Sequence, residues 1–405
     1  MIYAKRIKNT AAFLFALTLI INGQSKFLFS NDDLVEKLTD SYTDNEFVVK
    51  IIEIADSYLE KDVPTLTSVV SPMGEDHLHD YFSEGPYWWP NPEDPDGPYI
   101  RKDGNRNPDR FNIHKELMVG MYQAVSSIAI ALYLTHDEKY VKKLEQVIYD
   151  WFINSNTKMA PHLKYAQMIR NKDVIRGVGI IDTHRFVGLI EVLYLLKNTV
   201  LISKNKMKGL DIWLTEYYSW LTKSQWGIDE KYRGNNHSSW WAAQAAAIAI
   251  YLGQDDDLFE FYEYGKSFLI DRQINADCHQ PLEDERTLSL NYNTFNLNAL
   301  IYLAAALSTK GYNLFKYKNE YERSILCAAD YISQFITDPD NWELPQIKEY
   351  KVQPKEFTAV IGLRLNNKKY LQLHKELLEY SRSHSSKIYV DPFVLFLDAQ
   401  VSISN

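Results

Sequence analysis

The side chains best suited to chemistry stand together just before an alanine-rich apolar run. Asn235, Asn236 and His237 are followed by Ser238-Ser239-Trp240-Trp241. Asn often caps a helix, and a His beside a cap is commonly structural, so this cluster by itself leaves a structural role open. The same amide and imidazole groups can also bind an anion and transfer a proton.

Two further polar clusters precede apolar runs. Residues 283–293 contain Arg286 and Tyr292, although a charged segment of this kind is more commonly a solvated loop that ends in a helix cap. Residues 162–185 are also rich in His, Lys, Gln and Arg. Helix starts crowded with such side chains, at one end of several helices, predict a shared polar cleft.

Helices must position these clusters. Apolar residues recur at steps of three and four in nine stretches, which are Phe47–Leu59, Leu117–Leu134, Tyr140–Phe152, Phe186–Leu196, Trp240–Leu252, Phe259–Ile270, Phe295–Leu307, Tyr321–Ile336 and Tyr370–Tyr380. The run 241–250 is apolar nearly all round, which predicts a helix packed on several sides. We expect an all-α chain of roughly eleven or twelve helices, either a solenoid or a closed double ring. The absence of a visible sequence repeat weakens the solenoid.

Residues 71–112 form the exception to the helical pattern. Prolines at positions 86, 90, 92, 95 and 98 exclude a continuous helix. The segment still carries Tyr87, Trp88 and Trp89, which favours a loop folded over a binding site as a lid. Alternatively, the two tryptophans only fix the loop to the helical body. The loop can be both a lid and an anchored segment if one ring points into the binding site and the other packs on the helices.

Composition limits the classes of function. The 405 residues include 44 Lys and Arg against 53 Asp and Glu, a net charge of -9, which argues against a protein held to nucleic acid by a broadly basic surface. Any anionic ligand must therefore meet a local basic pocket. With 46% hydrophobic residues the chain can build a large core, and residues 26–405 can form one domain because closed rings run long as single units.

Residues 1–25 are typical of an export signal. Lys5, Arg6 and Lys8 precede an apolar run at 11–21 that is followed by small residues. The run is too short to span a bilayer, and no later stretch looks long and apolar enough to do so. We therefore expect a periplasmic or extracellular protein without stable membrane insertion; the alternatives are an uncleaved anchor and a buried first helix.

The chain has two cysteines, Cys278 and Cys327. They exclude a disulfide framework and a Cys-rich zinc site. A single bridge formed after export and two buried thiols are both open, because separation in sequence says nothing about distance in space.

Four motifs resemble, in order, those of the alginate lyase family of helical-toroid polysaccharide lyases. They are Gly85–Pro92, His162–Gln167, Gly179–Asp182 and Asn235–Trp240, and the resemblance covers residues 71–307. It implies an (α/α)n toroid of roughly five to seven helix pairs, a cleft for a uronic acid polymer, and a site that needs no metal or other cofactor. Its active-site Asn, His, Arg and Tyr match Asn236, His237, Arg286 and Tyr292 by position.

The resemblance also implies a reaction, β-elimination at a 1,4-linked uronide. Asn236 and Arg286 would stabilise the charge that grows on the substrate carboxylate when the C5 proton leaves. Tyr292 would serve as base and acid, with its pKa lowered by Arg286 and His237, and His237 could be the base for the opposite face of the sugar. Substrate contacts are expected from Tyr87, Trp88, Trp89, Lys164, Gln167 and Arg176.

Other functions remain to be weighed. A glycoside hydrolase on the same toroid would need two carboxylic acids across the bond, and Asp182 and Asp284 are candidates that nothing in the sequence pairs. A non-catalytic carbohydrate-binding protein would show gaps in the four positions, all of which are filled. The His and Asp residues at 76–80 could suggest a metal site, but a solvated loop explains them better. The catalytic set does not separate alginate, or its polymannuronate blocks, from glucuronan.

Overall fold

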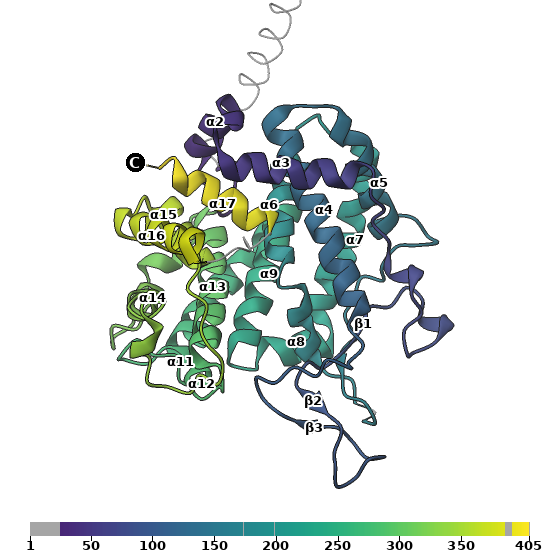
Figure 1. Cartoon of the computed structure of the whole chain (residues 1–405), viewed down its shortest axis with the longest axis vertical. Helices are drawn as coiled ribbons and strands as arrows, with labels where there is room; N and C mark the ends of the chain where they lie inside the picture. Colours follow the sequence, from purple (N-terminus) through teal and green to yellow (C-terminus); the bar gives the residue numbers. More distant parts are fainter. Residues whose placement is uncertain (1–24, 173, 198, 385–390, 405) are drawn as a thin grey trace, which may run out of the picture.

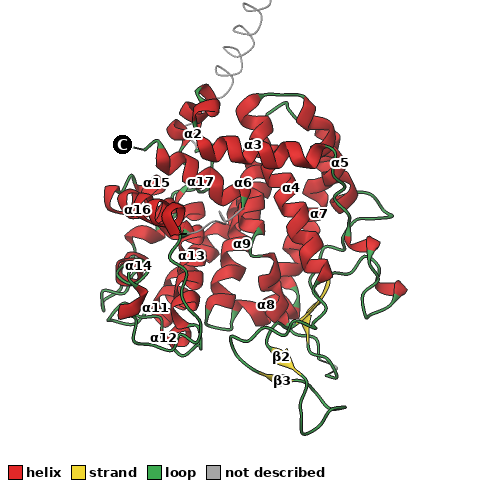
Figure 2. Cartoon of the chain, viewed as in Figure 1, coloured by secondary structure: helices red, strands yellow, loops and turns green. Residues whose placement is uncertain are grey.

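The structure is a computed structural model that describes residues 25–172, 174–197, 199–384 and 391–404. Helices make up 61% and strands 4% of the structure. Figure 2 shows the helices in red over most of the chain. The all-α class predicted from the apolar periodicity is therefore confirmed. The predicted export signal lies outside the described residues except for Ser25.

Six of the helices in the described ranges form an inner ring. They are α4 (Ile113–Thr135), α6 (Phe186–Lys197), α9 (Asn236–Leu252), α13 (Ser289–Ser308), α15 (Glu356–Leu365) and α17 (Pro392–Ser402). Each packs on the next, and α17 packs back on α4, so the ring is closed. Figure 1 shows α6, α9 and α13 next to one another near the centre.

Six outer helices alternate with the inner ones along the chain. They are α3 (Glu46–Leu59), α5 (Lys139–Phe152), α7 (Lys204–Lys223), α10 (Leu258–Tyr264), α14 (Ile325–Ser333) and α16 (Lys368–His384). Pairing each outer helix with the inner helix that follows it gives six pairs, within the range that the family resemblance implies. The toroid is thus confirmed, and the solenoid is excluded because the ends of the helix array meet.

The inner helices are buried on nearly all sides. In α9 the alanine-rich stretch from Ala242 to Ala249 is buried throughout, because small side chains let neighbouring helices approach closely. All nine stretches with helical periodicity contain helices. The stretch at 321–336 begins as a helix only at Ile325, where the Ser324 hydroxyl accepts a hydrogen bond from the Cys327 N–H and caps α14.

Shorter elements complete the fold. Four small helices lie between or before the ring helices: α2 (Asp32–Asp40), α8 (Gln225–Lys231), α11 (Asp271–Gln273) and α12 (Pro281–Asp284). A π-helical segment, Gly265–Ile270, continues α10. Residues Gly177–Thr183 form a 3-10 turn in which Gly179 is required, since a Cβ there would lie 2.2 Å from the Ala166 Cβ.

The proline-rich segment 71–112 is anchored at its base by a strand. β1 (Phe82–Glu84) pairs in parallel with β4 (Tyr165–Met168), and the hairpin of β2 (Trp88–Trp89) and β3 (Ile100–Arg101) extends beyond it. Figure 1 shows this hairpin projecting from the same end of the molecule as α8 and α12. We call residues 85–107 the lid hairpin.

Two predictions about the chain are resolved here. Ile113–Thr135 is long and apolar enough to cross a membrane, so the expectation that no such stretch exists was wrong; 72% of its apolar window is buried in the ring, which accounts for the composition. Cys278 and Cys327 form a disulfide with a Cα–Cα distance of 5.4 Å, so the alternative of two buried thiols is wrong.

Candidate active site

A cavity of about 800 Å³ opens where the inner helices begin. Lys115 comes from the first turn of α4, Asn236 from that of α9, Tyr292 from that of α13, and Lys355 directly precedes α15. The alternation of inner and outer helices makes the inner ones parallel, so their N-termini meet at one end. Helix N-termini carry partial positive charge, which favours an anion there.

The cavity brings together all four residues matched by the family resemblance. Asn236, His237, Arg286 and Tyr292 line it, although 56 positions separate the first from the last. Of the predicted substrate contacts, Tyr87, Trp88, Gln167 and Arg176 also line it. The shared polar cleft predicted from the clusters at helix starts is present.

Trp89 and Lys164 do not line this cavity. The Trp89 indole N–H donates to the Asn105 carbonyl within the lid hairpin, at 2.9 Å. Trp88 faces the cavity, so the two tryptophans point different ways. The Lys164 ammonium lies over the rings of Tyr165 and Trp226, 5.0 and 5.5 Å from their centroids.

Asn236 is held by Glu283, a buried carboxylate. The Asn236 side-chain nitrogen donates to the two Glu283 oxygens at 2.9 and 2.8 Å, and its backbone N–H donates to one of them at 2.7 Å. Seen from the Asn236 side-chain nitrogen, the two Glu283 oxygens lie in nearly the same direction, whereas the two N–H bonds of the amide diverge widely. One N–H therefore serves both oxygens, and the second is left to donate to a ligand.

His237 is oriented by another buried carboxylate. Its Nδ1 lies 2.6 Å from Oε1 of Glu230, which is fully buried, while Oε2 of Glu230 is 3.2 Å from Nε of Arg233. A carboxylate only accepts hydrogen bonds, so Nδ1 carries the proton. In the neutral imidazole, Nε2 is then an acceptor.

Arg286 makes a two-pronged ion pair with the lid hairpin. Its Nε and Nη2 donate to the Asp103 oxygens at 3.1 and 2.7 Å, and Thr287 donates to the same carboxylate through N–H and hydroxyl. Burial acts to raise the pKa of Asp103, but Arg286 and its other donors outweigh burial and bring this pKa to about 2. The guanidinium also stacks on Tyr292, 3.5 Å from the ring centroid.

Tyr292 donates its hydroxyl proton to the Tyr87 hydroxyl at 2.7 Å, again on the lid hairpin. Burial raises the pKa of Tyr292 far above its usual value, and Arg286 offsets only part of that rise. Arg286 lowers this pKa as expected, but the expected net lowering was wrong, because loss of water outweighs the cation. The raised pKa favours the neutral phenol of Tyr292.

The cavity wall is strongly basic. Ten of its lining residues are Lys or Arg and two are Asp or Glu, namely Arg101, Arg106, Lys115, Arg176, Arg185, Arg233, Arg286, Lys348, Lys351 and Lys355 against Asp182 and Glu349. Burial, with repulsion from Arg233 and Arg101, lowers the pKa of Arg176 to about 10. A chain with an excess of acidic residues has thus gathered cations around one cavity.

Asp182 and Asp284, the candidate hydrolase pair, have separate structural partners. Asp182 accepts hydrogen bonds from Tyr81, Ser83, Lys115 and Gln167 at 2.7 to 3.0 Å. Asp284 accepts from Asn293 and does not line the cavity. Nothing in the described part of the chain pairs them across a shared site.

The predicted loop at 76–80 forms hydrogen bonds rather than a metal cluster. Asp80 accepts from Nδ1 of His77 at 2.7 Å and lies 3.2 Å from Nε2 of His162, while His79 faces the Lys158 carbonyl. Within the ranges that the structure describes, no group of three or more His, Cys, Asp or Glu residues could hold a metal ion.

Sequence reasoning missed the three carboxylates that hold the site. Glu230, Glu283 and Asp103 each contact one of the four residues, yet Glu283 stands 47 positions from Asn236 and Asp103 stands 183 positions from Arg286. The sequence carries one signal, since Glu230 precedes His237 by seven positions in a short helix and turn.

Comparisons with known proteins agree with this geometry. The alginate lyase family model matches residues 66–342. The solved structure of an alginate lyase from Bacteroides ovatus is 28% identical, with a TM-score of 0.81 over 92% of this chain and 98% of that one. Alginate lyase A1-III from Sphingomonas species A1 is 17% identical over 80% and 87% of the two chains and, at a TM-score of 0.50, shares the fold. No curated protein sequence matches.

Proposed function

Since the chain belongs to the alginate lyase family and is a polysaccharide lyase, we propose that it cleaves a 1,4-linked uronic acid polymer by β-elimination. The product would carry an unsaturated uronide at the new chain end. One observation carries this proposal: the four residues Asn236, His237, Arg286 and Tyr292 line one cavity whose charged residues are ten cations and two anions.

The basic wall suits a polymer with a carboxylate on every sugar. An anion bound beside Arg176 would relieve the repulsion that Arg101 and Arg233 exert on it. Arginine binds a carboxylate in a two-pronged geometry that a neutral sugar cannot use. A neutral glucan has no carboxylate to offer these guanidinium groups.

The reaction requires removal of the weakly acidic C5 proton and loss of the oxygen on C4. Removal of the proton places a second negative charge on the substrate carboxylate, which fixed donors stabilise as an oxyanion hole does. The second Asn236 N–H and the guanidinium of Arg286 are the donors in the cavity suited to this. Glu283 would fix the position of the Asn236 amide.

With His237 as a proton acceptor and Tyr292 as a neutral phenol, the base and the acid would be different groups. His237, with Nε2 as an acceptor, would take the C5 proton, and the neutral Tyr292 phenol would protonate the departing oxygen. Two groups suit guluronate, in which the proton and the oxygen leave from opposite faces. In mannuronate and glucuronate they leave from one face, so Tyr292 would first give its proton to Nε2 of His237 and then, as a phenolate, act as the base and afterwards as the acid.

We propose alginate as the first substrate to test, because the similar structure from Bacteroides ovatus is that of an alginate lyase. Glucuronan is the second, because mannuronate and glucuronate differ only at C2, away from the reacting atoms. We also propose that the protein is exported. The disulfide between Cys278 and Cys327 supports this, since such bonds persist in oxidising compartments.

The test is a cleavage assay of the chain that begins at residue 26. Polymannuronate, polyguluronate, glucuronan and glycosaminoglycans are supplied separately, and ultraviolet absorbance of the conjugated product is followed together with new reducing ends. A rise in both supports elimination. New reducing ends without absorbance would indicate a hydrolase, and binding without either signal would indicate a carbohydrate-binding protein.

A further inference from the structure

A second cavity, of about 1080 Å³, adjoins the candidate active site. Helices α3, α13 and α16 and the segment 337–356 build it, and we call it the second chamber. The two cavities share His184, Phe295 and the extended segment 348–355, which we call the lysine segment. The lysine segment therefore borders both the candidate active site and the second chamber.

The cations of the second chamber lie outside the range that the family model matches. That range ends at residue 342, whereas Lys348, Lys351 and Lys355 follow it and Lys50 precedes it. The match to the family therefore does not account for these lysines.

Lys355 is the most unusual of them. It is 7% exposed, and its ammonium makes one hydrogen bond, to the Lys351 carbonyl at 3.2 Å, and lies over the Tyr350 ring. Among the residues that the structure describes, no carboxylate oxygen lies within 4 Å of it. Burial lowers the pKa of Lys355 to about 8. Burying a cation without a partner is costly, so a ligand is the expected source of one.

Carboxylates of the second chamber do not pair directly with Lys355, although the charge of Glu356 offsets part of the effect of burial on its pKa. Glu356 accepts a hydrogen bond from Asn298, Asp398 faces His374 at 2.8 Å, and Glu46 pairs with Arg382. Three others, Asp338, Asp340 and Glu349, are exposed to solvent. Lys348 and Lys351 likewise have no carboxylate within 4 Å in the described part of the chain, so three neighbouring lysines remain available to an anion.

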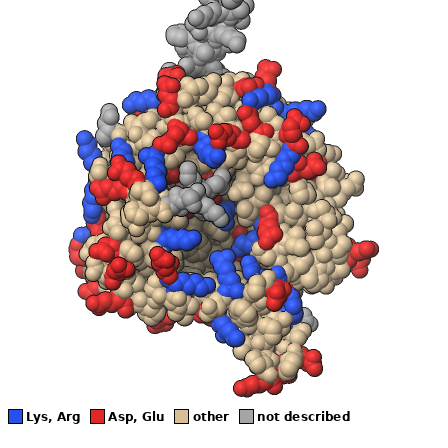
Figure 3. Space-filling view, viewed as in Figure 1, with Lys and Arg blue, Asp and Glu red and all other residues tan. Residues whose placement is uncertain are grey.

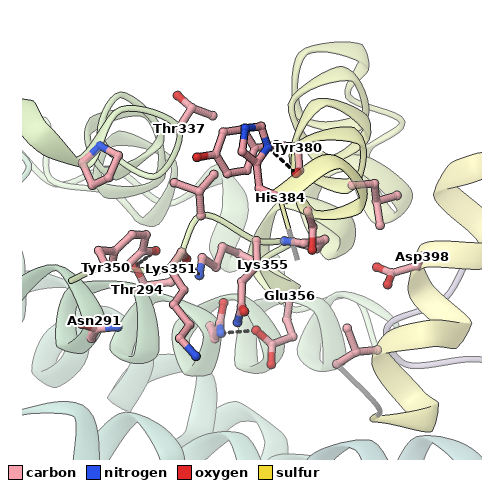
Figure 4. Close-up of a pocket in the computed structure, with 18 of the residues that line it drawn as sticks. Asn291, Thr294, Thr337, Tyr350, Lys351, Lys355, Glu356, Tyr380, His384 and Asp398 are labelled. Atoms are coloured by element: carbon pink, nitrogen blue, oxygen red, sulfur yellow. Dashed lines mark hydrogen bonds between the residues drawn. The ribbon is translucent and has the colours of Figure 1, made fainter. Parts of the chain in front are cut away.

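Figure 4 shows how these groups lie. Lys351 and Lys355 extend from one segment toward α13, the helix that carries Asn291 and Thr294, and Glu356 follows Lys355 at the start of α15. Asn291 and Phe295, one turn apart on α13, line both cavities. A chain of sugars leaving the reacting residues would meet the lysine segment next.

We propose that the lysine segment and the second chamber form an extended subsite for the polymer, in which Lys355 binds the carboxylate of a uronate beyond the reacting sugar. Drug-sized ligands fill cavities of about 300 to 1000 Å³, so the second chamber has room for more than one sugar ring. This inference rests on the proposed uronate lyase function, and it adds that the enzyme gains affinity from chain length.

The test compares Lys355→Met with Lys208→Met in binding and cleavage. Lys208 is exposed on α7, lines neither cavity, and so matches the loss of charge alone. Each substitution is combined with Tyr292→Phe, and calorimetry measures the Kd for oligomers of graded length from the polymer that the unsubstituted enzyme cleaves. We expect Lys355→Met to weaken the longest oligomer about tenfold, as one lost charge-assisted hydrogen bond would, and to leave the shortest unchanged.

The two proposals fail differently. If the unsubstituted enzyme cleaves a uronate polymer but Lys355→Met and Lys208→Met bind every oligomer equally, the extended subsite is wrong and the lyase function stands. If no uronate polymer is cleaved, the lyase function fails and the subsite with it. Should Lys355→Met melt below the assay temperature, Lys351→Met is used instead. This exposed position should weaken the longest oligomer about threefold, and no change there would overturn the subsite.

Discussion

Replacing Tyr292 by Phe removes one hydroxyl group from the cavity and leaves the aromatic ring on Arg286. The hydroxyl has one hydrogen bond in the structure, to Tyr87 at 2.7 Å. Losing it should cost about 1 kcal/mol of unfolding free energy. The lost proton transfer should lower kcat by two to four powers of ten, or about 3 to 5 kcal/mol in the barrier.

The effect on catalysis should therefore far exceed the effect on stability. KM should change little, because the basic wall and Trp88 still hold the substrate. Tyr140→Phe is the matched control: its buried ring also loses one hydroxyl hydrogen bond, to Asp56 at 2.8 Å, but lies outside both cavities. The control should lose a similar amount of stability and keep its kcat.

The assay follows product absorbance for both variants, with circular dichroism and thermal melting as checks on the fold. A Tyr292→Phe enzyme with kcat near that of the unsubstituted protein would refute the assignment of Tyr292 as the acid. The neighbouring phenol, Tyr87, would then be the next residue to replace, followed by Tyr165 and Tyr232. A large loss of kcat in Tyr140→Phe as well would show that the effect is structural.

Three further substitutions test other parts of the structure. Asn236→Ala should lower turnover by about 3 to 4 kcal/mol in the barrier, measured as kcat, if its amide acts as one oxyanion donor. Asp103→Asn should lower unfolding free energy by about 2 kcal/mol near pH 7, because a pKa lowered from 3.8 to about 2 stabilises the fold above pH 4. This difference should shrink as pH falls from 4 toward 2, which urea titrations at a series of pH values would check; a constant difference would contradict it. Glu191→Ala should lower the melting temperature by several degrees, since its carboxylate accepts three backbone N–H groups of residues 28–30, each costing about 1 kcal/mol or more when unpaired.

Apolar periodicity predicted those helices that have one buried face and one polar face. The nine stretches with apolar steps of three and four all contain helices, because one packed face is enough to produce the pattern. Three ring helices, α7, α15 and α17, were not among them. α17 is short and apolar nearly all round, so it has no polar face from which to recognise a period, and its partners α3 and α4 lie far away in the sequence.

Closure of the ring could not be derived from periodicity. It depends on α17 packing against α3 and α4, contacts between the last and first helices of the toroid. Before the family resemblance was considered, a solenoid and a closed ring were both open for this reason. The four motifs predicted a closed ring because they resemble a family with a toroid fold, whereas periodicity alone does not distinguish a ring from a solenoid.

The sequence predicted which residues make up the site, but it did not predict how burial shifts the pKa of Tyr292. Asn236 and His237 are adjacent in sequence and begin one helix, so they could be recognised together. Tyr292 was expected to be acidic because cations are near it, yet burial raises its pKa instead. A sequence shows which charges are available, whereas the depth of a phenol in the protein depends on the whole fold.

The distribution of charge connects the fold with the proposed substrate. A net charge of -9 would repel a polyanion from an evenly charged protein, and Figure 3 shows Lys and Arg gathered around a hollow on one face. The ring makes this separation possible, because parallel inner helices present their N-termini, and the residues that begin them, at one end. Salt at physiological strength screens exposed charges beyond about 8 Å, so the acidic exterior matters little to a sugar already inside. What remains is the local excess of ten cations over two anions, which would favour carboxylates before any group performs chemistry.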